Sequence, residues 1–113
     1  MLRRSAGSAG LVSRAPVFAA LGDETRLALV DRLCARGPQS IALLTTGSAV
    51  TRQAVTKHLN VLAGAGLVRD VRRGRERIWE LEPEGLDEAR GSLDEISQRW
   101  DEALGRLRRF VED

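Results

Sequence analysis

The chain contains few of the residues that usually carry catalysis or bind metal ions. Its 113 residues include one cysteine, Cys34, one histidine, His58, and no tyrosine. A lone cysteine cannot form an internal disulfide, and one thiol with one imidazole cannot complete a transition-metal site of about four ligands. The sequence also has no glycine-rich phosphate loop. We therefore expect a protein that is not an enzyme and that holds no cofactor and no metal.

Long hydrophobic stretches are missing as well. No apolar run approaches the ~20 residues that a membrane-spanning helix requires. The first residues include Arg3 and Arg4, but residues 5–13 are rich in Gly, Ser and Ala and are too weakly apolar for the core of a signal peptide. We expect a cytoplasmic protein with no membrane partner.

The composition is typical of one globular domain. Hydrophobic residues make up 42% of the chain and charged residues 30%. A chain of this length builds a single modest core. We expect a flexible N-terminal arm over residues 1–14 and one domain over residues 15–113.

Charge is distributed unevenly along the chain. Residues 51–79 hold seven basic and two acidic side chains, a net charge of +5, whereas residues 80–113 hold eleven acidic and five basic ones, a net charge of −6. A polyanion is attracted to the first region and repelled by the second. This favours a nucleic-acid partner for the basic region, although charge alone leaves open that both are ordinary solvated faces.

Two short helices are expected at the start of the domain. The first covers residues 16–21 and the second follows Asp23, whose carboxylate can cap free backbone amides. The second helix ends at the Gly37-Pro38 pair. The three-and-four spacing predicts that its buried stripe consists of Leu27, Val30, Leu33 and Cys34.

Two more helices flank a Gly-Ser break at residues 47–48. Ser40 is expected to cap the shorter one, which runs to about Thr46. Its inward residues are predicted to be Ile41, Leu44 and Leu43. Thr51 is expected to cap the longer one, which ends at the glycines of residues 64–66. Its predicted buried stripe is Val55, Leu59 and Leu62. Its predicted outward residues are Arg52, Gln53, Thr56, Lys57 and Asn60.

Two β-type runs follow, joined by an arginine-rich turn. Residues 67–72 and 75–81 are expected to form strands that meet near Arg73-Gly74, where glycine can adopt a positive φ. A helix, a turn, a second helix and a basic hairpin follow one another in this order. That order is typical of a winged helix that enters a DNA groove.

The last segment, residues 85–112, predicts a long helix with an apolar seam. Its seam residues recur in alternating steps of three and four, as in a coiled-coil heptad. They are Leu86, Ala89, Leu93, Ile96, Trp100, Ala103, Leu107 and Phe110. Such a helix reaches ~40 Å, which is more than a small domain can cover. We therefore expect a homodimer interface that includes Leu93, Ile96, Trp100 and Leu107. The alternative is that the helix packs on its own domain.

These elements together predict a mainly α fold with a small β-hairpin. We expect a winged helix-turn-helix with five helices, a two-stranded wing and a long C-terminal dimerisation helix over about residues 85–112.

Several segments resemble the ArsR/SmtB family of bacterial repressors. Residues 21–26 (LGDETR) are similar to the family's opening, residues 51–59 (TRQAVTKHL) and 65–68 (AGLV) to its recognition helix and strand entry, and residues 73–75 with 79–81 to its wing. The resemblance extends over nearly the whole chain. It implies a homodimer that binds double-stranded operator DNA, represses transcription and dimerises through its first and last helices.

The metal sites of that family are not matched. Metal-sensing members use a Cys-x-Cys pair on the third helix or Asp, His and Glu clusters on the last helix. Here residues 40–44 (SIALL) contain no ligand, and the last helix has carboxylates but no His or Cys. Residues 93–100 (LDEISQRW) resemble a metal-independent branch of the family. We expect no metal effector.

The outward face of the helix after Thr51 carries side chains suited to reading bases. Arg and Lys pair with guanine, Gln with adenine, and the Thr methyl group with the thymine methyl group. We predict base contacts from Arg52, Gln53, Thr56 and Lys57, phosphate contacts from Ser48 and Thr51, and wing contacts from Arg72, Arg73, Arg75 and Arg77. Because side chains alternate along a strand, we expect about two of the four wing arginines to reach DNA.

The sequence therefore predicts a DNA-binding transcriptional regulator, acting as a dimeric repressor on an inverted-repeat operator. The alternative is a protein-interaction module in which the winged helix and the heptad helix bind another protein. That module would show no steep salt dependence of DNA binding and would purify as a hetero-oligomer. The sequence does not identify the effector.

Overall fold

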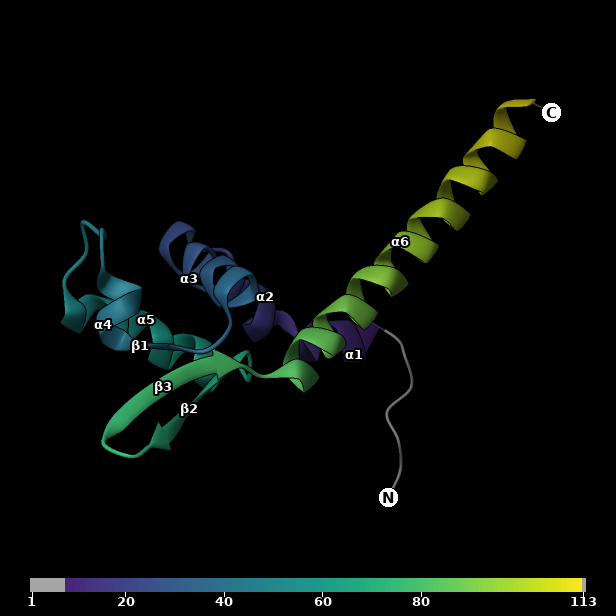
Figure 1. The fold of residues 1–113 in the computed structure, drawn as a ribbon. Helices are drawn as coiled ribbons and strands as arrows, with labels where there is room; N and C mark the ends of the chain where they lie inside the picture. Colours follow the sequence, from purple (N-terminus) through teal and green to yellow (C-terminus); the bar gives the residue numbers. More distant parts are fainter. Residues whose placement is uncertain (1–7, 113) are drawn as a thin grey trace, which may run out of the picture.

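A helical body, a β-sheet and one long projecting helix make up residues 8–112, which are the residues that the computed structural model describes (Figure 1). The elements are α1 (Ser8–Ser13), α2 (Ala15–Leu21), α3 (Glu24–Arg36), β1 (Gln39–Ser40), α4 (Ile41–Thr45), α5 (Arg52–Gly64), β2 (Val68–Arg73), β3 (Glu76–Leu81) and α6 (Pro83–Glu112). This is the predicted winged helix-turn-helix, in which α4, the following turn and α5 are the helix-turn-helix and β2 with β3 form the wing.

The N-terminal stretch differs from the expected flexible arm. Residues 8–13 form α1, and Ser13 Oγ donates a hydrogen bond to the carbonyl oxygen of Gly10 at 2.8 Å. Residues 1–7 lie outside the described part of the chain. The described chain therefore has six helices where five were expected.

The predicted caps set the starts of three helices. Asp23 Oδ2 accepts from the backbone N–H of Arg26 at 3.0 Å, and Ser40 Oγ accepts from the N–H of Leu43 at 3.3 Å. Thr51 Oγ1 accepts from the N–H of Ala54 at 3.1 Å. Each side chain satisfies a backbone donor that has no partner within the helix. The three cap predictions are confirmed.

The core lies between α3, α4, α5 and the sheet. Its largest fully buried members are Trp79, Leu33, Leu44, Leu59, Leu62, Leu67 and Val55. The predicted α5 stripe is therefore confirmed. The position of α5 in the domain follows from this stripe, because burial of these three side chains leaves the opposite face in solvent.

The predicted stripe of α3 is partly wrong. Leu27 is 53% exposed and Cys34 is exposed, while Leu29 is buried beside Val30 and Leu33. The predicted stripe with Leu27 and the observed stripe with Leu29 both include Val30 and Leu33, and both are compatible with the helical period. In the fold α3 is rotated toward α5 and β3, so Leu29 faces inward.

The predicted inward set of α4 is also partly wrong. Leu44 is buried and Ile41 packs against the core, but Leu43 is 53% exposed. With only five residues, α4 presents a narrow face to the core. That face holds positions three apart and leaves the two residues between them outside.

The sheet has three strands, whereas a two-stranded wing was expected. Its order is β1-β3-β2, and both pairings are antiparallel. The additional strand β1 pairs Gln39 with Trp79 and Ser40 with Ile78. Two residues are too few to show the alternation that marks a strand in sequence. The turn between β2 and β3 contains Gly74 at φ +62°, where an L side chain would be strained.

Helix α6 begins against the body and then leaves it. Gly85, Ala89 and Ser92 are buried, and α6 contacts α2. Farther along, α6 projects away from the rest of the molecule (Figure 1). Its thirty residues correspond to a length of about 45 Å. No helix within residues 8–112 is long and apolar enough to cross a bilayer.

Gly85 fixes the contact between α6 and the loop that leads into the wing. A Cβ at this position would lie 1.9 Å from the carbonyl oxygen of Gly66. We predict that Gly85→Ala lowers the free energy of unfolding by about 1–3 kcal/mol, because the backbones must separate. Gly91→Ala is the matched control, since a Cβ on Gly91 meets nothing within 4 Å. We expect it to be neutral or stabilising by up to ~1 kcal/mol. Urea unfolding of both variants measures the difference, and equal midpoints would contradict the close packing.

Candidate nucleic-acid interface

Helix α5 presents a polar face to solvent. Arg52, Gln53 and Lys57 are exposed, whereas Thr56 is half-buried. Within the described residues neither Arg52 nor Lys57 has an acidic partner within 4 Å. Both charges are therefore free to meet an external anion. The four predicted base-reading residues lie on consecutive turns at the N-terminal half of α5.

The hydroxyl groups near the start of α5 already make local hydrogen bonds. Thr56 Oγ1 donates to the carbonyl oxygen of Arg52 at 3.0 Å, so only its lone pairs and methyl group remain for a ligand. Ser48 Oγ accepts from the N–H of Val50 at 3.0 Å, as Thr51 Oγ1 does from Ala54. Ser48 and Thr51 each keep a hydroxyl proton that could be donated to a phosphate oxygen.

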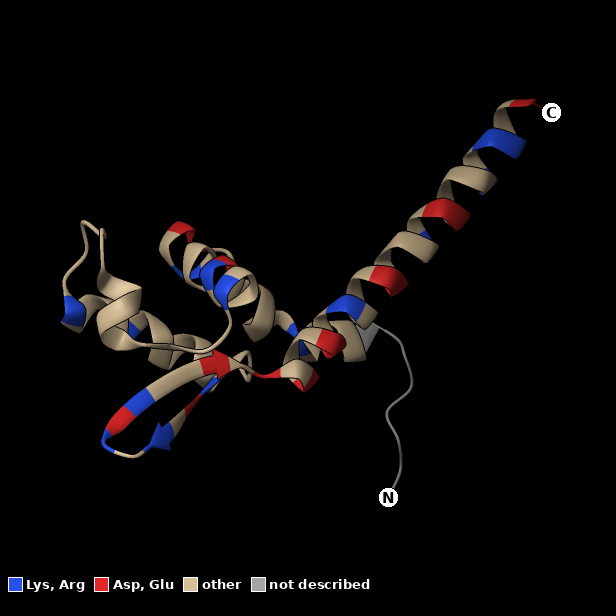
Figure 2. Cartoon of the chain, in the orientation of Figure 1, with Lys and Arg blue, Asp and Glu red and all other residues tan. Residues whose placement is uncertain are grey.

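The wing strands place their arginines on two faces. The register pairs Asp70 with Trp79 and Arg72 with Arg77, so these four residues share one face of the hairpin. Arg73 belongs to the other face, and Arg75 lies in the turn. Figure 2 shows basic residues along the wing and at the start of α5, with acidic residues interspersed in the wing.

Acidic neighbours neutralise several of these arginines. Arg77 Nε donates to Asp70 Oδ2 at 2.5 Å, and its guanidinium lies 5.1 Å from the ring centre of Trp79. This hydrogen bond lowers the pKa of Asp70 below its ordinary value. Arg69 Nε donates to Glu80 Oε2 at 2.8 Å, which raises the pKa of Arg69. Arg69 and Arg77 are therefore held by acidic neighbours within the protein.

Two wing arginines remain without such a partner. Within residues 8–112, Arg72 and Arg75 make no ion pair, and Arg73 approaches Glu80 only at 4.0 Å. Arg72 also lies directly across from Arg77, and like charges in that position repel. Arg72 and Arg75 are thus the wing cations most available to an external anion.

A contact that the sequence did not reveal connects α5 to the preceding helices. Arg26 Nη1 lies 3.4 Å from His58 Nδ1, and Arg26 Nε donates to the carbonyl oxygen of Ala20 at 2.7 Å. His58 Nδ1 also lies 3.8 Å from Asp23 Oδ2. The hydrogen bond from the backbone N–H of Arg26 lowers the pKa of Asp23. These residues join the C-terminal end of α2 and the N-terminal end of α3 to the middle of α5.

Possible metal-ligating side chains are dispersed over the described part of the chain. Residues 8–112 contain no group of three or more His, Cys, Asp and Glu side chains that could hold a metal ion. Cys34, which was expected to be buried, is exposed on α3. His58 lies on α5 and is occupied by Arg26 and Asp23.

Comparison with known proteins also identifies the helix-turn-helix. A helix-turn-helix domain family matches residues 21–71, from the end of α2 into β2. The HTH-type transcriptional regulator Rv2034 of Mycobacterium tuberculosis is 44% identical over 85 residues, which cover 75% of this chain and 76% of that protein.

Two solved structures share the fold over most of the chain. An ArsR-like transcriptional regulator from Rhodococcus sp. RHA1 has a TM-score of 0.75 and 39% identity, covering 91% of this chain and 93% of that one. The homodimeric winged helix-turn-helix DNA-binding domain of Mb0332 from Mycobacterium bovis has a TM-score of 0.62 and 27% identity, covering 88% and 91%. The chain therefore belongs to the ArsR family of winged helix-turn-helix transcriptional regulators, and its helix-turn-helix is a DNA-binding domain.

Proposed function

We propose that the protein is a dimeric repressor that reads an inverted-repeat operator. The observation that carries this proposal is the set of unpaired cations on α5 and the wing: Arg52, Lys57, Arg72 and Arg75. Neighbouring carboxylates neutralise Arg69 and Arg77 of the same region, but not these. In Figure 1 the start of α5 and the wing turn lie at the end of the molecule opposite to the C-terminal end of α6.

Recognition of the DNA sequence is assigned to the N-terminal half of α5. A recognition helix in the major groove contacts base edges with residues near its N-terminus. The exposed side chains of Arg52, Gln53 and Lys57 supply donors for guanine and adenine, and Thr56 supplies a methyl group and an acceptor. Thr51 at the N-cap brings backbone amides to a phosphate, where the helix dipole also favours negative charge.

The wing is assigned to the DNA backbone. We predict that Arg72→Ala weakens binding similarly for all sequences and reduces the slope of log K against log salt by about one per subunit. Arg73 and Arg75 are assigned the same kind of contact, with Arg73 weaker because Glu80 lies near it. Arg77→Ala is the matched control, since Arg77 is bound by Asp70 and covers Trp79. Fluorescence anisotropy at several salt concentrations measures both slopes, and an unchanged slope for Arg72→Ala would contradict the assignment.

Dimerisation is assigned to the apolar seam of α6. Leu93, Ile96, Trp100 and Leu107 are between 46% and 65% exposed in the single chain, and Phe110 is 81% exposed. Such a row of large apolar side chains on a projecting helix is a surface that normally binds a partner. A second copy fits because a two-fold interface buries the same patch on both subunits. The homodimeric Mb0332 domain, which shares the fold, supports this assignment.

A dimer presents two α5 helices to the DNA. Two half-sites related by a two-fold axis, about one helical turn or ~10 bp apart, match such a protein. Repression is what membership of this family implies, since a dimer bound at a promoter blocks access to it. We assign no metal effector, because Cys34 and His58 lie on different helices and His58 already contacts Arg26.

The proposal is tested by anisotropy titration of labelled duplex from the chain's own upstream region. The titration is run with excess random-sequence DNA and at two salt concentrations. We expect binding that survives the competitor and weakens with salt. Binding that the competitor abolishes would overturn specific recognition of that duplex. No binding at low salt would favour the alternative of a protein-interaction module.

A further inference from the structure

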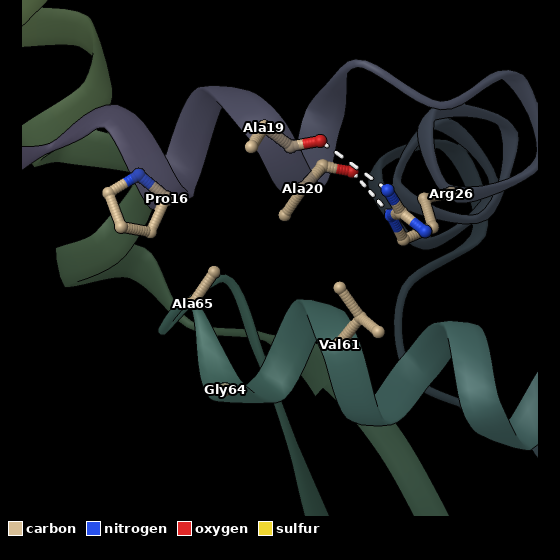
Figure 3. Close-up of a pocket in the computed structure, with 7 residues that line it drawn as sticks. All are labelled: Pro16, Ala19, Ala20, Arg26, Val61, Gly64 and Ala65. Atoms are coloured by element: carbon tan, nitrogen blue, oxygen red, sulfur yellow. Dashed lines mark hydrogen bonds between the residues drawn. The ribbon is translucent and has the colours of Figure 1, made fainter.

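A cavity of about 280 Å³, open to solvent on one side, lies between α2 and the C-terminal half of α5 (Figure 3). Pro16, Ala19 and Ala20 form the α2 wall, and Val61, Gly64 and Ala65 form the opposite wall. All six residues are small or apolar, and no side chain of theirs reaches across the space between the helices (Figure 3). The cavity is therefore a consequence of the alanine and glycine residues that face each other there.

One charged group lies at the edge of this apolar space. Arg26 lines the cavity, and its guanidinium is held by the carbonyl oxygens of Ala20 at 2.7 Å and Ala19 at 3.4 Å (Figure 3). A third N–H faces His58 Nδ1 at 3.4 Å. A guanidinium has five N–H donors, so two remain. Within the described residues no carboxylate oxygen lies within 4 Å of the Arg26 guanidinium. The neighbouring Asp23 carboxylate accepts from the backbone N–H of Arg26 instead.

We propose that this cavity binds a small organic carboxylate with a compact apolar body and that its occupation weakens DNA binding. The size matches this class: an apolar cavity of ~150 Å³ holds benzene, so about 280 Å³ accommodates one ring with a carboxymethyl group. The apolar walls bind the ring, and the remaining Arg26 donors bind the carboxylate. A fixed guanidinium favours the planar, two-oxygen geometry of a carboxylate over a neutral amide.

The position of the cavity connects it to the DNA-reading helix. Val61 and Gly64 belong to α5, nine and twelve residues beyond Arg52 at its base-reading end, and α2 contacts α6. A carboxylate bound to the two remaining Arg26 donors places a negative charge beside the contact between Arg26 and His58, which links α3 to α5. A ligand shifts an equilibrium only by its difference in affinity for the two states. The regulatory half of the inference, that an occupied cavity weakens DNA binding, rests on the proposed function. The binding half, that the cavity takes a carboxylate, does not.

Phenylacetate is the test probe and phenylacetamide is its neutral match. Titration of the full chain, followed by the NMR methyl signals of Ala19, Val61 and Ala65, is expected to show saturable shifts. We expect phenylacetate to bind about tenfold more tightly than phenylacetamide. The absence of saturable shifts with phenylacetate would overturn the site.

Two glycines provide matched variants. Gly64 lines the cavity and a Cβ on it meets nothing within 4 Å, so Gly64→Leu adds an apolar side chain at the cavity wall, and Gly91→Leu makes the same change on α6 away from it. Phenylacetate affinity is expected to fall at least about tenfold in Gly64→Leu and to stay unchanged in Gly91→Leu. Arg26→Gln, checked for folding by circular dichroism, should remove the preference for phenylacetate. Equal binding by Gly64→Leu and Gly91→Leu would place the ligand elsewhere and overturn the proposal.

The regulatory half is measured on DNA. Saturating phenylacetate is expected to weaken binding to a duplex selected by the protein from a random pool by about tenfold. Reciprocity then requires the duplex to weaken phenylacetate binding by the same factor. Unchanged DNA affinity with the cavity occupied would overturn the effector role and leave the site intact. A protein that binds no DNA would overturn the proposed function, while the NMR titration would still decide the site.

Discussion

Trp100→Glu is expected to convert the dimer into monomers. The side chain of Trp100 is 65% exposed on the single chain and lies in the middle of the α6 seam. Large aromatic residues at the centre of an interface often contribute 2 kcal/mol or more, and a glutamate in that place buries an unpaired charge. We expect the dimer dissociation constant to rise by at least about 100-fold.

Sedimentation equilibrium measures this change directly. The mass should fall from about twice 12.4 kDa to that of the single chain, 12.4 kDa. Gln98→Glu is the matched control, because it adds the same charge to α6 at an exposed position outside the seam. It should leave the mass of the dimer unchanged. A Trp100→Glu protein that keeps the mass of the unmodified protein would show that the seam is not the interface.

Replacing both Arg52 and Lys57 by alanine is expected to abolish recognition of the operator while the dimer stays intact. Each specific contact to a base contributes about 1–3 kcal/mol. The double variant should therefore lose at least roughly 30-fold in affinity for the operator, because two such contacts amount to about 2 kcal/mol or more. Neither side chain is buried or ion-paired in the described chain, so we expect little effect on folding.

The control for this variant removes a charge elsewhere. Arg90 is exposed on α6, and Arg90→Ala should leave operator affinity nearly unchanged, apart from a small loss of general electrostatic attraction. Competition between operator and random-sequence duplex separates a loss of operator recognition from a loss of general electrostatic attraction. If the Arg52/Lys57 variant retained the preference of the unmodified protein for the operator, the assignment of α5 as the reading helix would be wrong.

Local chemistry explains why much of the fold could be predicted from the sequence. Asp23, Ser40 and Thr51 each stand where a helix begins, and each makes the expected hydrogen bond to a backbone amide. The stripe of Val55 and Leu59 on α5 repeats with the helical period and is buried. Caps and periodicity are properties of neighbouring residues, so the sequence contains them.

The features that the sequence did not reveal depend on distant partners. Strand β1 is only two residues long and is defined by its pairing with β3. The exposure of Leu27 follows from the rotation of α3 toward its neighbours, since both possible stripes have helical spacing. Residues 8–13 (SAGLVS) form a helix of only six residues, and their Gly, Ser and Ala content is also typical of a flexible arm.

In the candidate site too, some features follow from neighbouring residues and others depend on distant partners. The exposed polar face of α5 follows from its buried stripe, and the structure places all four predicted base-reading residues on that helix. The four wing arginines look equivalent in sequence, but the register gives Arg77 a partner in Asp70 and leaves Arg72 without one. The contact of Arg26 with His58 joins positions 32 residues apart, and no local pattern indicates it.

Hydroxyl-radical footprinting of the protein on its selected duplex tests the central claim most directly. Two α5 helices related by a two-fold axis should protect two backbone patches, ~10 bp apart and symmetric about one centre. The Trp100→Glu variant should lose this paired pattern at the same protein concentration. A single asymmetric patch, or uniform protection of the duplex, would contradict a dimer that reads an inverted repeat.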